Sequence, residues 1–173
     1  MAEILPDYLA RGLRVVICGT AVARASASTG HYYAGPGNQF WQFLWGSRII
    51  GEPLSPLSDS RVLRFGVGLT DLAKSTSASS DRGLQGVDVR AFIEKMERYQ
   101  PAWIAFHGKK AAEYVSHYLG FGRDVSLGEQ PWTVAGRPVF VLPSASAANQ
   151  DASRLEGKPT RQAWFSELRK RLP

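Results

Sequence analysis

The sequence predicts an α/β protein: a three-layer α/β/α sandwich around a central, mostly parallel, four-stranded sheet. Two observations lead to this prediction. Short apolar runs, each about the length of a strand, alternate with segments in which apolar residues recur at helical spacing. The runs are also almost continuously apolar, which is typical of central strands covered by helices on both faces. We expect a single domain over residues 1–173.

The four predicted strands are the apolar runs themselves. They are Leu13–Cys18, Phe65–Leu69, Ala102–Phe106 and Val139–Leu142. Glycine, His107-Gly108 and proline follow the first, third and fourth of these runs, and glycine and proline are common at strand ends. Phe65–Leu69 is the weakest candidate. Two other segments are predicted to lack regular structure. Residues 51–60 have the composition of a turn-rich connection, and the small polar tract Ser75–Ser80 predicts a mobile surface loop.

Three helices are predicted between and after these strands. Residues 89–99 place apolar side chains at i, i+3, i+4 and i+7 and follow Asp88, a favourable N-cap. Residues 109–119 begin a helix directly after the Gly108 turn. At the C-terminus, Pro159-Thr160 precedes a helix with an apolar stripe and several basic residues outside it.

Composition and charge limit the classes of function. Lys and Arg number 21 against 15 for Asp and Glu, so the net charge of +6 favours an acidic partner. Cys18 is the only cysteine, which excludes a disulfide framework and all-cysteine zinc or iron–sulfur sites, and which fits a reducing compartment. No apolar run approaches the roughly 20 residues that cross a bilayer, and the N-terminus lacks a secretory signal. We expect an intracellular protein of the cytoplasm or nucleoid, with no metal, no other cofactor and no membrane contact.

The loops that follow the strands are where a ligand is expected, because parallel sheets bind ligands beyond the carboxyl ends of their strands. The longest is residues 19–41. Small residues fill its first half, where a ligand can approach the backbone, and aromatic residues fill its second half. It contains neither of the glycine-rich phosphate motifs. A loop of this length is typical of a functional site, although Phe40 and Trp41 on their own are as expected in a core.

This loop resembles the first motif of the uracil-DNA glycosylase superfamily. The string CGTAVARASASTGHYYAGPGNQFW is closest to the mismatch-specific uracil/thymine branch, whose pattern is G-I-N-P-G, small residues, then T-G-x-x-F-A-x-P-x-N-R-F-W. Three more segments match this branch in the same order. They are residues 66–72 (GVGLTDL), 99–111 (YQPAWIAFHGKKA) and 139–147 (VFVLPSASA). The resemblance covers most of residues 13–150 and implies a glycosylase that flips a base out of DNA and cleaves its N-glycosidic bond.

Two positions depart from the family pattern at residues that carry its chemistry. The family's catalytic Asn, which holds the attacking water, falls on Ala21, and a methyl group cannot position a proton. The Asn that opens the last motif falls on Ser144, and the following Pro on Ala145. Loss of the catalytic, water-holding Asn weakens hydrolysis without forbidding it, since donors that stabilise the departing base anion contribute independently.

The resemblance and the strand ends together give a set of candidate site residues. Tyr33 takes the position that stacks on the base, and Asn38, Gly19 and Ala21 lie where the family shapes its base pocket. Asp71 is the nearest group that could orient the water, and a helix cap or solvated loop residue is its alternative. A neutral His107 could bond a base carbonyl, or could be structural. The hydroxyls of Thr20 and Ser144 complete the candidate catalytic group.

Contacts to DNA are expected at the same edge of the sheet. The loop Ser144–Gln150 resembles the segment that fills the gap left by the flipped base, and its tip predicts polar rather than apolar insertion. Its contact residues would be Ser146, Ala147, Ala148, Asn149 and Gln150. Lysines and an arginine follow loops on this edge and could meet phosphates as a cluster. They are Lys74, Lys109, Lys110, Arg154 and Lys158.

Three hypotheses remain open at this point. The leading one is a monomeric DNA glycosylase that removes uracil, with other deaminated or damaged bases as an extension, from single- or double-stranded DNA. Ala21 and Ser144 support a second, in which a degenerate family member binds damaged or single-stranded DNA without cutting it. The third, an enzyme acting on free nucleosides or nucleotides, rests on the fold class alone.

Overall fold

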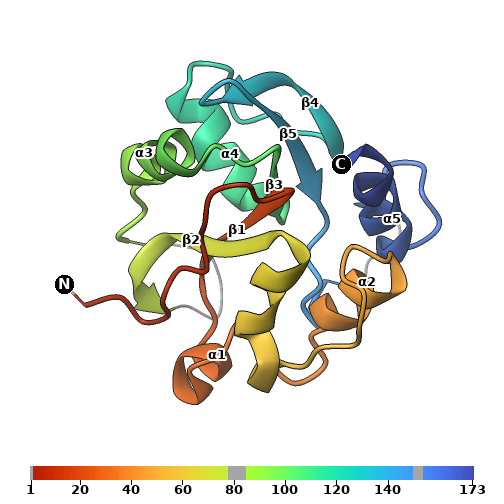
Figure 1. The fold of residues 1–173 in the computed structure, drawn as a ribbon. Helices are drawn as coiled ribbons and strands as arrows, with labels where there is room; N and C mark the ends of the chain where they lie inside the picture. The colour runs from red at the N-terminus through yellow and green to blue at the C-terminus, as the bar shows by residue number, and fades with distance from the viewer. Residues whose placement is uncertain (1, 78–84, 150–153) are drawn as a thin grey trace.

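The computed structural model describes residues 2–77, 85–149 and 154–173, and they form an α/β/α sandwich (Figure 1). Five strands make the sheet, in the order β2-β1-β3-β5-β4. Their bounds are β1 Val15–Val22, β2 Val67–Ser77, β3 Trp103–His107, β4 Gly128–Val134 and β5 Arg137–Leu142. β2, β1, β3 and β5 are parallel, and β4 is antiparallel to β5. The predicted three-layer, mostly parallel architecture is therefore confirmed.

Helices cover both faces of this sheet (Figure 1). α3 (Val89–Tyr99) and α4 (Lys109–Tyr118) bury side chains such as Phe92, Met96 and Val115 on one face. α2 (Phe40–Gly46), α5 (Arg161–Arg171) and the 3-10 helix η1 (Pro56–Phe65) cover the other. A short helix, α1 (Arg24–Thr29), follows β1. The expected caps are present, because Asp88 accepts the backbone N–H of Ala91 and Thr160 that of Ala163.

The fifth strand, β4, was not predicted. Its buried and exposed positions alternate along much of its length, as on a strand with only one covered face, so it lacks a continuous apolar run. Pro131 adds to the difficulty, since proline is depleted from strands and the pairing with β5 shifts register between Glu129 and Thr133. Continuous apolar runs therefore mark the four central strands, and this edge strand has none.

Two strands run further toward the candidate site than predicted. β1 does not end at Cys18 but continues through Gly19, Thr20 and Ala21 to Val22, paired with β2. β2 begins at Val67 and includes Ser75–Ser77, so the first half of the predicted Ser75–Ser80 loop is strand and residues 78–80 lie outside the described ranges. The predicted connection at 51–60 is irregular only up to the start of η1 at Pro56. These extensions place Gly19 directly opposite Asp71.

The segment before β1 adds to the sheet edge beside β2. Tyr8 and Leu69 form an antiparallel bridge, and the backbone N–H of Ile4 donates to the carbonyl of Lys74. Asp7 then contacts both β2 and α3, because Lys74, Lys95 and the Thr70 hydroxyl all donate to its carboxylate. Burial alone would raise the pKa of Asp7, but these three hydrogen bonds lower it below its usual value.

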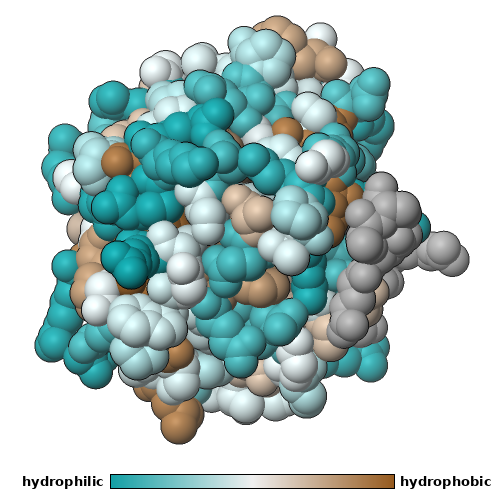
Figure 2. All heavy atoms as spheres, turned by 90° about the vertical axis from the view of Figure 1, so that its right-hand side faces the viewer, coloured by the Kyte–Doolittle hydropathy of each residue, from teal (hydrophilic) through white to brown (hydrophobic). Residues whose placement is uncertain are grey.

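The face that carries α2 and α5 is mainly hydrophilic, with scattered hydrophobic atoms rather than one broad patch (Figure 2). No helix in the described ranges is long and apolar enough to span a membrane.

Candidate active site

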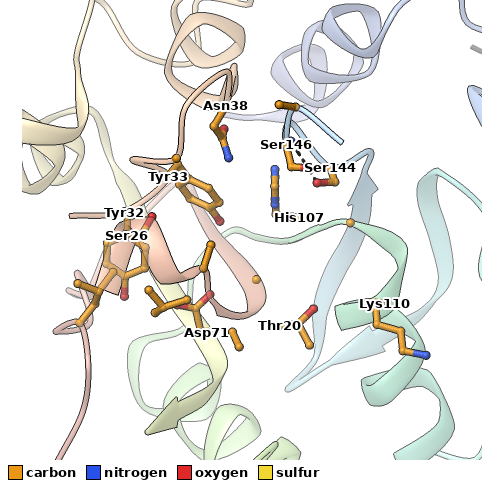
Figure 3. Close-up of a pocket in the computed structure, with 18 of the residues that line it drawn as sticks. Thr20, Ser26, Tyr32, Tyr33, Asn38, Asp71, His107, Lys110, Ser144 and Ser146 are labelled. Carbon is orange, nitrogen blue, oxygen red and sulfur yellow. Dashed lines mark hydrogen bonds between the residues drawn. The ribbon is translucent and has the colours of Figure 1, made fainter. Parts of the chain in front are cut away.

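A pocket of about 250 Å³ lies at the carboxyl ends of the parallel strands (Figure 3). It brings together segments that are distant in the sequence: the end of β1, the loop before α2, β2, the β3–α4 turn and the loop after β5. Eleven of the predicted site residues line it. They are Gly19, Thr20, Ala21, Tyr33, Asn38, Asp71, His107, Lys110, Ser144, Ser146 and Ala147.

Asp71 is a buried carboxylate in this pocket. The residue is 5 % exposed, and its Oδ2 atom has neither solvent contact nor a hydrogen-bond partner. Burial raises its pKa to about 7; nearby Lys74 and Lys95 oppose the rise and Asp7 adds to it. Asp71 lies on β2 in register with Gly19, two residues before Ala21 on the neighbouring strand. A group that changes its protonation state near neutral pH therefore lines the same pocket as Ala21, the position where the family pattern has Asn.

Gly19 makes room for this carboxylate. A Cβ atom at position 19 would lie 2.6 Å from Oδ1 of Asp71 and 3.6 Å from the hydroxyl of Tyr33. The first distance is well inside van der Waals contact, so any larger residue would displace Asp71 or the strand. The glycine is thus required by the close approach of β1 to a side chain of β2.

Tyr33 forms one wall of the pocket. Its ring stacks on Phe40 with centroids 3.7 Å apart, and the ring of His107 meets it edge-on at 4.8 Å. Tyr33 has a φ of +53°, an unusual value for a residue with a side chain. The loop around it is held from α1, because the Ser26 hydroxyl accepts the backbone N–H of Ala34. The strained backbone and the Phe40 contact fix a flat aromatic surface inside the pocket.

His107 ends β3 and is neutral at physiological pH. Burial lowers its pKa to about 3, and the positive charge of Arg161 contributes to this. Its Nε2 atom accepts the backbone N–H of Ala145 at 2.9 Å. The ring proton therefore lies on Nδ1, and a donor from this ring to a ligand would have to be Nδ1–H.

Asn38 has one end fixed and the other directed inward. Its Oδ1 atom accepts the backbone N–H of Phe40 at 2.9 Å, which leaves the amide nitrogen as its second polar end. That nitrogen points into the pocket near His107, while Asp71 and Thr20 lie at the opposite end (Figure 3). The pocket is therefore polar at two ends, with the Tyr33 ring between them.

Arg161 is a structural residue of the site that the sequence did not indicate. From the start of α5 its guanidinium donates to the carbonyls of Ser144 and Ser146 and to the side chain of Gln39. The backbone of Gln39 also donates to Ala145, so the loops before α2 and after β5 are held as a pair. Nothing in the local pattern of α5 marks this role. Leu5, which lines the pocket, and Asp7, which pairs with Lys74 and Lys95, were also missed, because they precede the first motif.

The residues predicted to contact DNA are placed in different ways. Lys110 lines the pocket, Ala147 and Ala148 are exposed on the loop after β5, and Asn149 folds back to donate to the Ser144 carbonyl. Gln150 lies outside the described residues. Lys74 is largely buried against Asp7 and Tyr32 and faces a second cavity. Lys109 forms an ion pair with Glu156, and Lys158 forms one with Glu167. The predicted lysines are thus mostly ion-paired in this structure, and their contacts to DNA stay a prediction.

The arrangement suits a hydrolysis that needs a general base and neutral hydrogen-bond donors. Asp71 can accept a proton when it is ionised, and His107 and Asn38 can donate from the other end of the pocket. Within the described ranges, no three His, Cys, Asp or Glu side chains are grouped so that they could hold a metal ion.

Comparison with known proteins identifies the family of this chain. A sequence model of the uracil DNA glycosylase superfamily matches residues 6–172. The chain is also similar to the solution NMR structure of a candidate uracil DNA glycosylase from Methanosarcina acetivorans, with 23% identity and a TM-score of 0.62 over 96% of this chain and 95% of that one. At this identity the structural match establishes the fold. Because the family match covers nearly the whole chain, the protein belongs to the uracil DNA glycosylase superfamily.

Proposed function

We propose that this protein flips uracil out of DNA and hydrolyses its N-glycosidic bond, which begins base excision repair. The observation that supports this most strongly is the buried Asp71 carboxylate, whose pKa of about 7 suits a general base at neutral pH. It lines the same pocket as Ala21, which cannot perform the role of the Asn in the family pattern. Asp71 therefore supplies the function that Ala21 has lost. The four collinear sequence segments further support a place near the mismatch-specific branch.

In the proposed reaction the ends of the pocket have separate roles. The flipped base stacks on Tyr33, and the amide nitrogen of Asn38 and Nδ1–H of His107 donate to its oxygen atoms. Asp71 at the other end accepts a proton from water as the water oxygen bonds to C1′ of the sugar. The bond between C1′ and the base breaks, its electron pair leaves with the base, and the base anion takes a proton from solvent. The neutral donors stabilise this anion as it forms.

We propose that the protein acts as a monomer. The hydroxyl of Ser144 is held inside the pocket, where it donates to or accepts from the substrate; it also accepts the backbone N–H of Ser146. Thr20 lies at the Asp71 end (Figure 3). We assign both hydroxyls to binding of the sugar and the departing base.

A second function is favoured by one specific observation. Ala21 removes the side chain that the family pattern uses for water, so a module that binds damaged or single-stranded DNA without cutting it would need no replacement. Such a module gains nothing from a buried carboxylate with an unpartnered oxygen, which lowers the stability of the fold. The presence of Asp71 therefore favours the enzyme.

An alkali-cleavage assay distinguishes these functions. A labelled oligonucleotide with one uracil, single-stranded or in a duplex, is incubated with the protein and then with hot alkali, and the same oligonucleotide with thymine is the control. We expect strand breaks at the uracil position alone. Binding without breaks would favour the DNA-binding module, and neither binding nor breaks would favour an enzyme acting on free nucleosides or nucleotides.

A further inference from the structure

Two buried side-chain oxygens in the pocket have no partner. Among the described residues they are the hydroxyl of Tyr33 and Oδ2 of Asp71, and no other side-chain nitrogen or oxygen there is both shielded from solvent and without a hydrogen bond. An unsatisfied buried polar atom costs about 1–3 kcal/mol, so each one in a folded protein calls for an explanation. Both atoms belong to residues that line the same pocket, so a single explanation should account for both.

The two groups converge on one point in space. The hydroxyl of Tyr33 and Oδ1 of Asp71 both lie over the α-carbon of Gly19, where a Cβ would be 3.6 Å from the first and 2.6 Å from the second. They can be no further apart than the sum of these distances, yet the hydroxyl makes no direct hydrogen bond to the carboxylate. Figure 3 shows the Tyr33 hydroxyl turned toward the Asp71 end of the pocket. A small molecule with both donors and acceptors can bridge such a pair.

Stacking does not explain the hydroxyl. The Tyr33 ring packs on Phe40 and meets His107 edge-on, and these contacts need only the ring. A phenylalanine would provide the same surface without a buried polar atom. The hydroxyl also stays protonated, because burial and the nearby Asp71 raise the pKa of Tyr33 well above its usual value. It can therefore form hydrogen bonds but cannot act as a base.

We propose that the Tyr33 hydroxyl and the Asp71 carboxylate together hold the attacking water, so that Tyr33 orients the nucleophile as well as stacking on the base. This rests on the proposed function. The water oxygen is held between the hydroxyl and the carboxylate and bonds to C1′ as one water proton moves to Asp71. The N-glycosidic bond breaks, its electrons leave with the base, and the base takes a proton from solvent. Tyr33 neither gains nor loses a proton in the reaction.

The test compares Tyr33→Phe with the wild type by two measurements. The first is an NMR titration of the Asp71 carboxyl carbon in the free protein, with Asp71→Asn to assign the signal. The bridge stabilises the ionised carboxylate, so its loss in Tyr33→Phe should raise the midpoint by at least about half a pH unit. The second is the single-turnover rate on a uracil oligonucleotide at pH 7, which should fall about tenfold while the affinity for the oligonucleotide is kept.

Tyr8→Phe is the matched control. It removes another partly buried hydroxyl, one that donates to Asp59 outside the pocket, and it should leave the Asp71 midpoint and the rate unchanged. An Asp71 midpoint that is the same in Tyr33→Phe and wild type would overturn the proposal, whatever the rates. A raised midpoint in a protein that does not excise uracil would support the bridge and refute the uracil assignment, so the two failures can be told apart.

Discussion

Asp71→Asn should slow uracil excision more than tenfold and, at the same time, make the folded protein more stable at pH 8. The amide has nearly the shape of the carboxyl group but cannot accept a proton from water. A lower excision rate would therefore reflect the loss of the general base and not a change in packing. The rate is measured in single turnover with excess protein, which removes product release from the result. Asp124→Asn, at an exposed carboxylate, should change neither the rate nor the stability.

The gain in stability follows from the direction of the pKa shift. In the folded protein the pKa of Asp71 is raised from 3.8 to about 7, so the folded state holds the proton more tightly than the unfolded chain. The contribution of Asp71 to the free energy of unfolding is therefore fully present below pH 4, where the side chain is protonated in both states. It is lost as the pH rises through about 7. At pH 8 the ionised carboxylate costs the folded state up to about 4 kcal/mol, since one pKa unit corresponds to about 1.4 kcal/mol. The Asn variant avoids this cost.

Thermal or denaturant unfolding at pH 4 and pH 8 measures this effect. The advantage of Asp71→Asn over wild type should be larger at pH 8 than at pH 4. A variant that is slower and also less stable at pH 8 would show that Asp71 supports the fold instead of the reaction.

Tyr33→Ala should reduce kcat/KM for uracil excision by about 10- to 100-fold. Stacking of a base on an aromatic side chain contributes about 1–3 kcal/mol, and the Tyr33 ring is held in place for it by its contacts with Phe40 and His107. Tyr33→Phe keeps the ring and should keep the affinity for DNA, which separates the contribution of the ring from that of the hydroxyl. Unfolding curves must show that the alanine variant is folded at the assay temperature.

Lys110→Ala is the comparison for Tyr33→Ala within the same pocket. It removes one partly exposed charge that also faces Glu113, so we expect kcat/KM to fall by less than about fivefold. The salt dependence of DNA binding should correspond to the release of about one counterion fewer. Equal losses in the two alanine variants would contradict a stacking role for Tyr33, because a single phosphate contact among several has substitutes and the aromatic surface has none.

The parts of the fold that could be predicted share one physical feature. The central strands are buried on both faces, so their apolar runs are nearly continuous and easily recognised. β4 has one exposed face and contains Pro131, and so its sequence resembles a loop. The extension of β1 past Gly19 was also missed, because glycine usually ends a strand, whereas here it is needed for the close approach of Asp71.

The site could be predicted as far as its residues belong to recognisable motifs. Tyr33 lies in the long loop, Asp71, His107 and Ser144 come just after predicted strands, and the structure brings all four into one pocket. Arg161 could not be found this way, because its role depends on where α5 packs against two distant loops. The ion pair of Lys74 with Asp7 was missed for a similar reason. Asp7 precedes the first motif and reaches Lys74 because the N-terminal segment pairs with the edge of β2.

The ion pairs of the lysines predicted to contact DNA change the interpretation of the net charge of +6. Lys74, Lys109, Lys110 and Lys158 each have an acidic partner at 3.6 Å or less, so the edge around the pocket is less positive than the sequence implies. Recognition of DNA at this edge should then depend more on the pocket and on the Ser144–Asn149 loop than on a continuous basic surface.

The pH dependence of the single-turnover excision rate tests most directly whether ionised Asp71 is the base. For the wild type the rate should rise about tenfold per pH unit from pH 5 and level off near pH 7, where the carboxylate becomes fully ionised. In Asp71→Asn the residual rate should be independent of pH over the same range. A wild-type rate that is constant from pH 5 to pH 9 would contradict the assignment of Asp71 as the group that activates water.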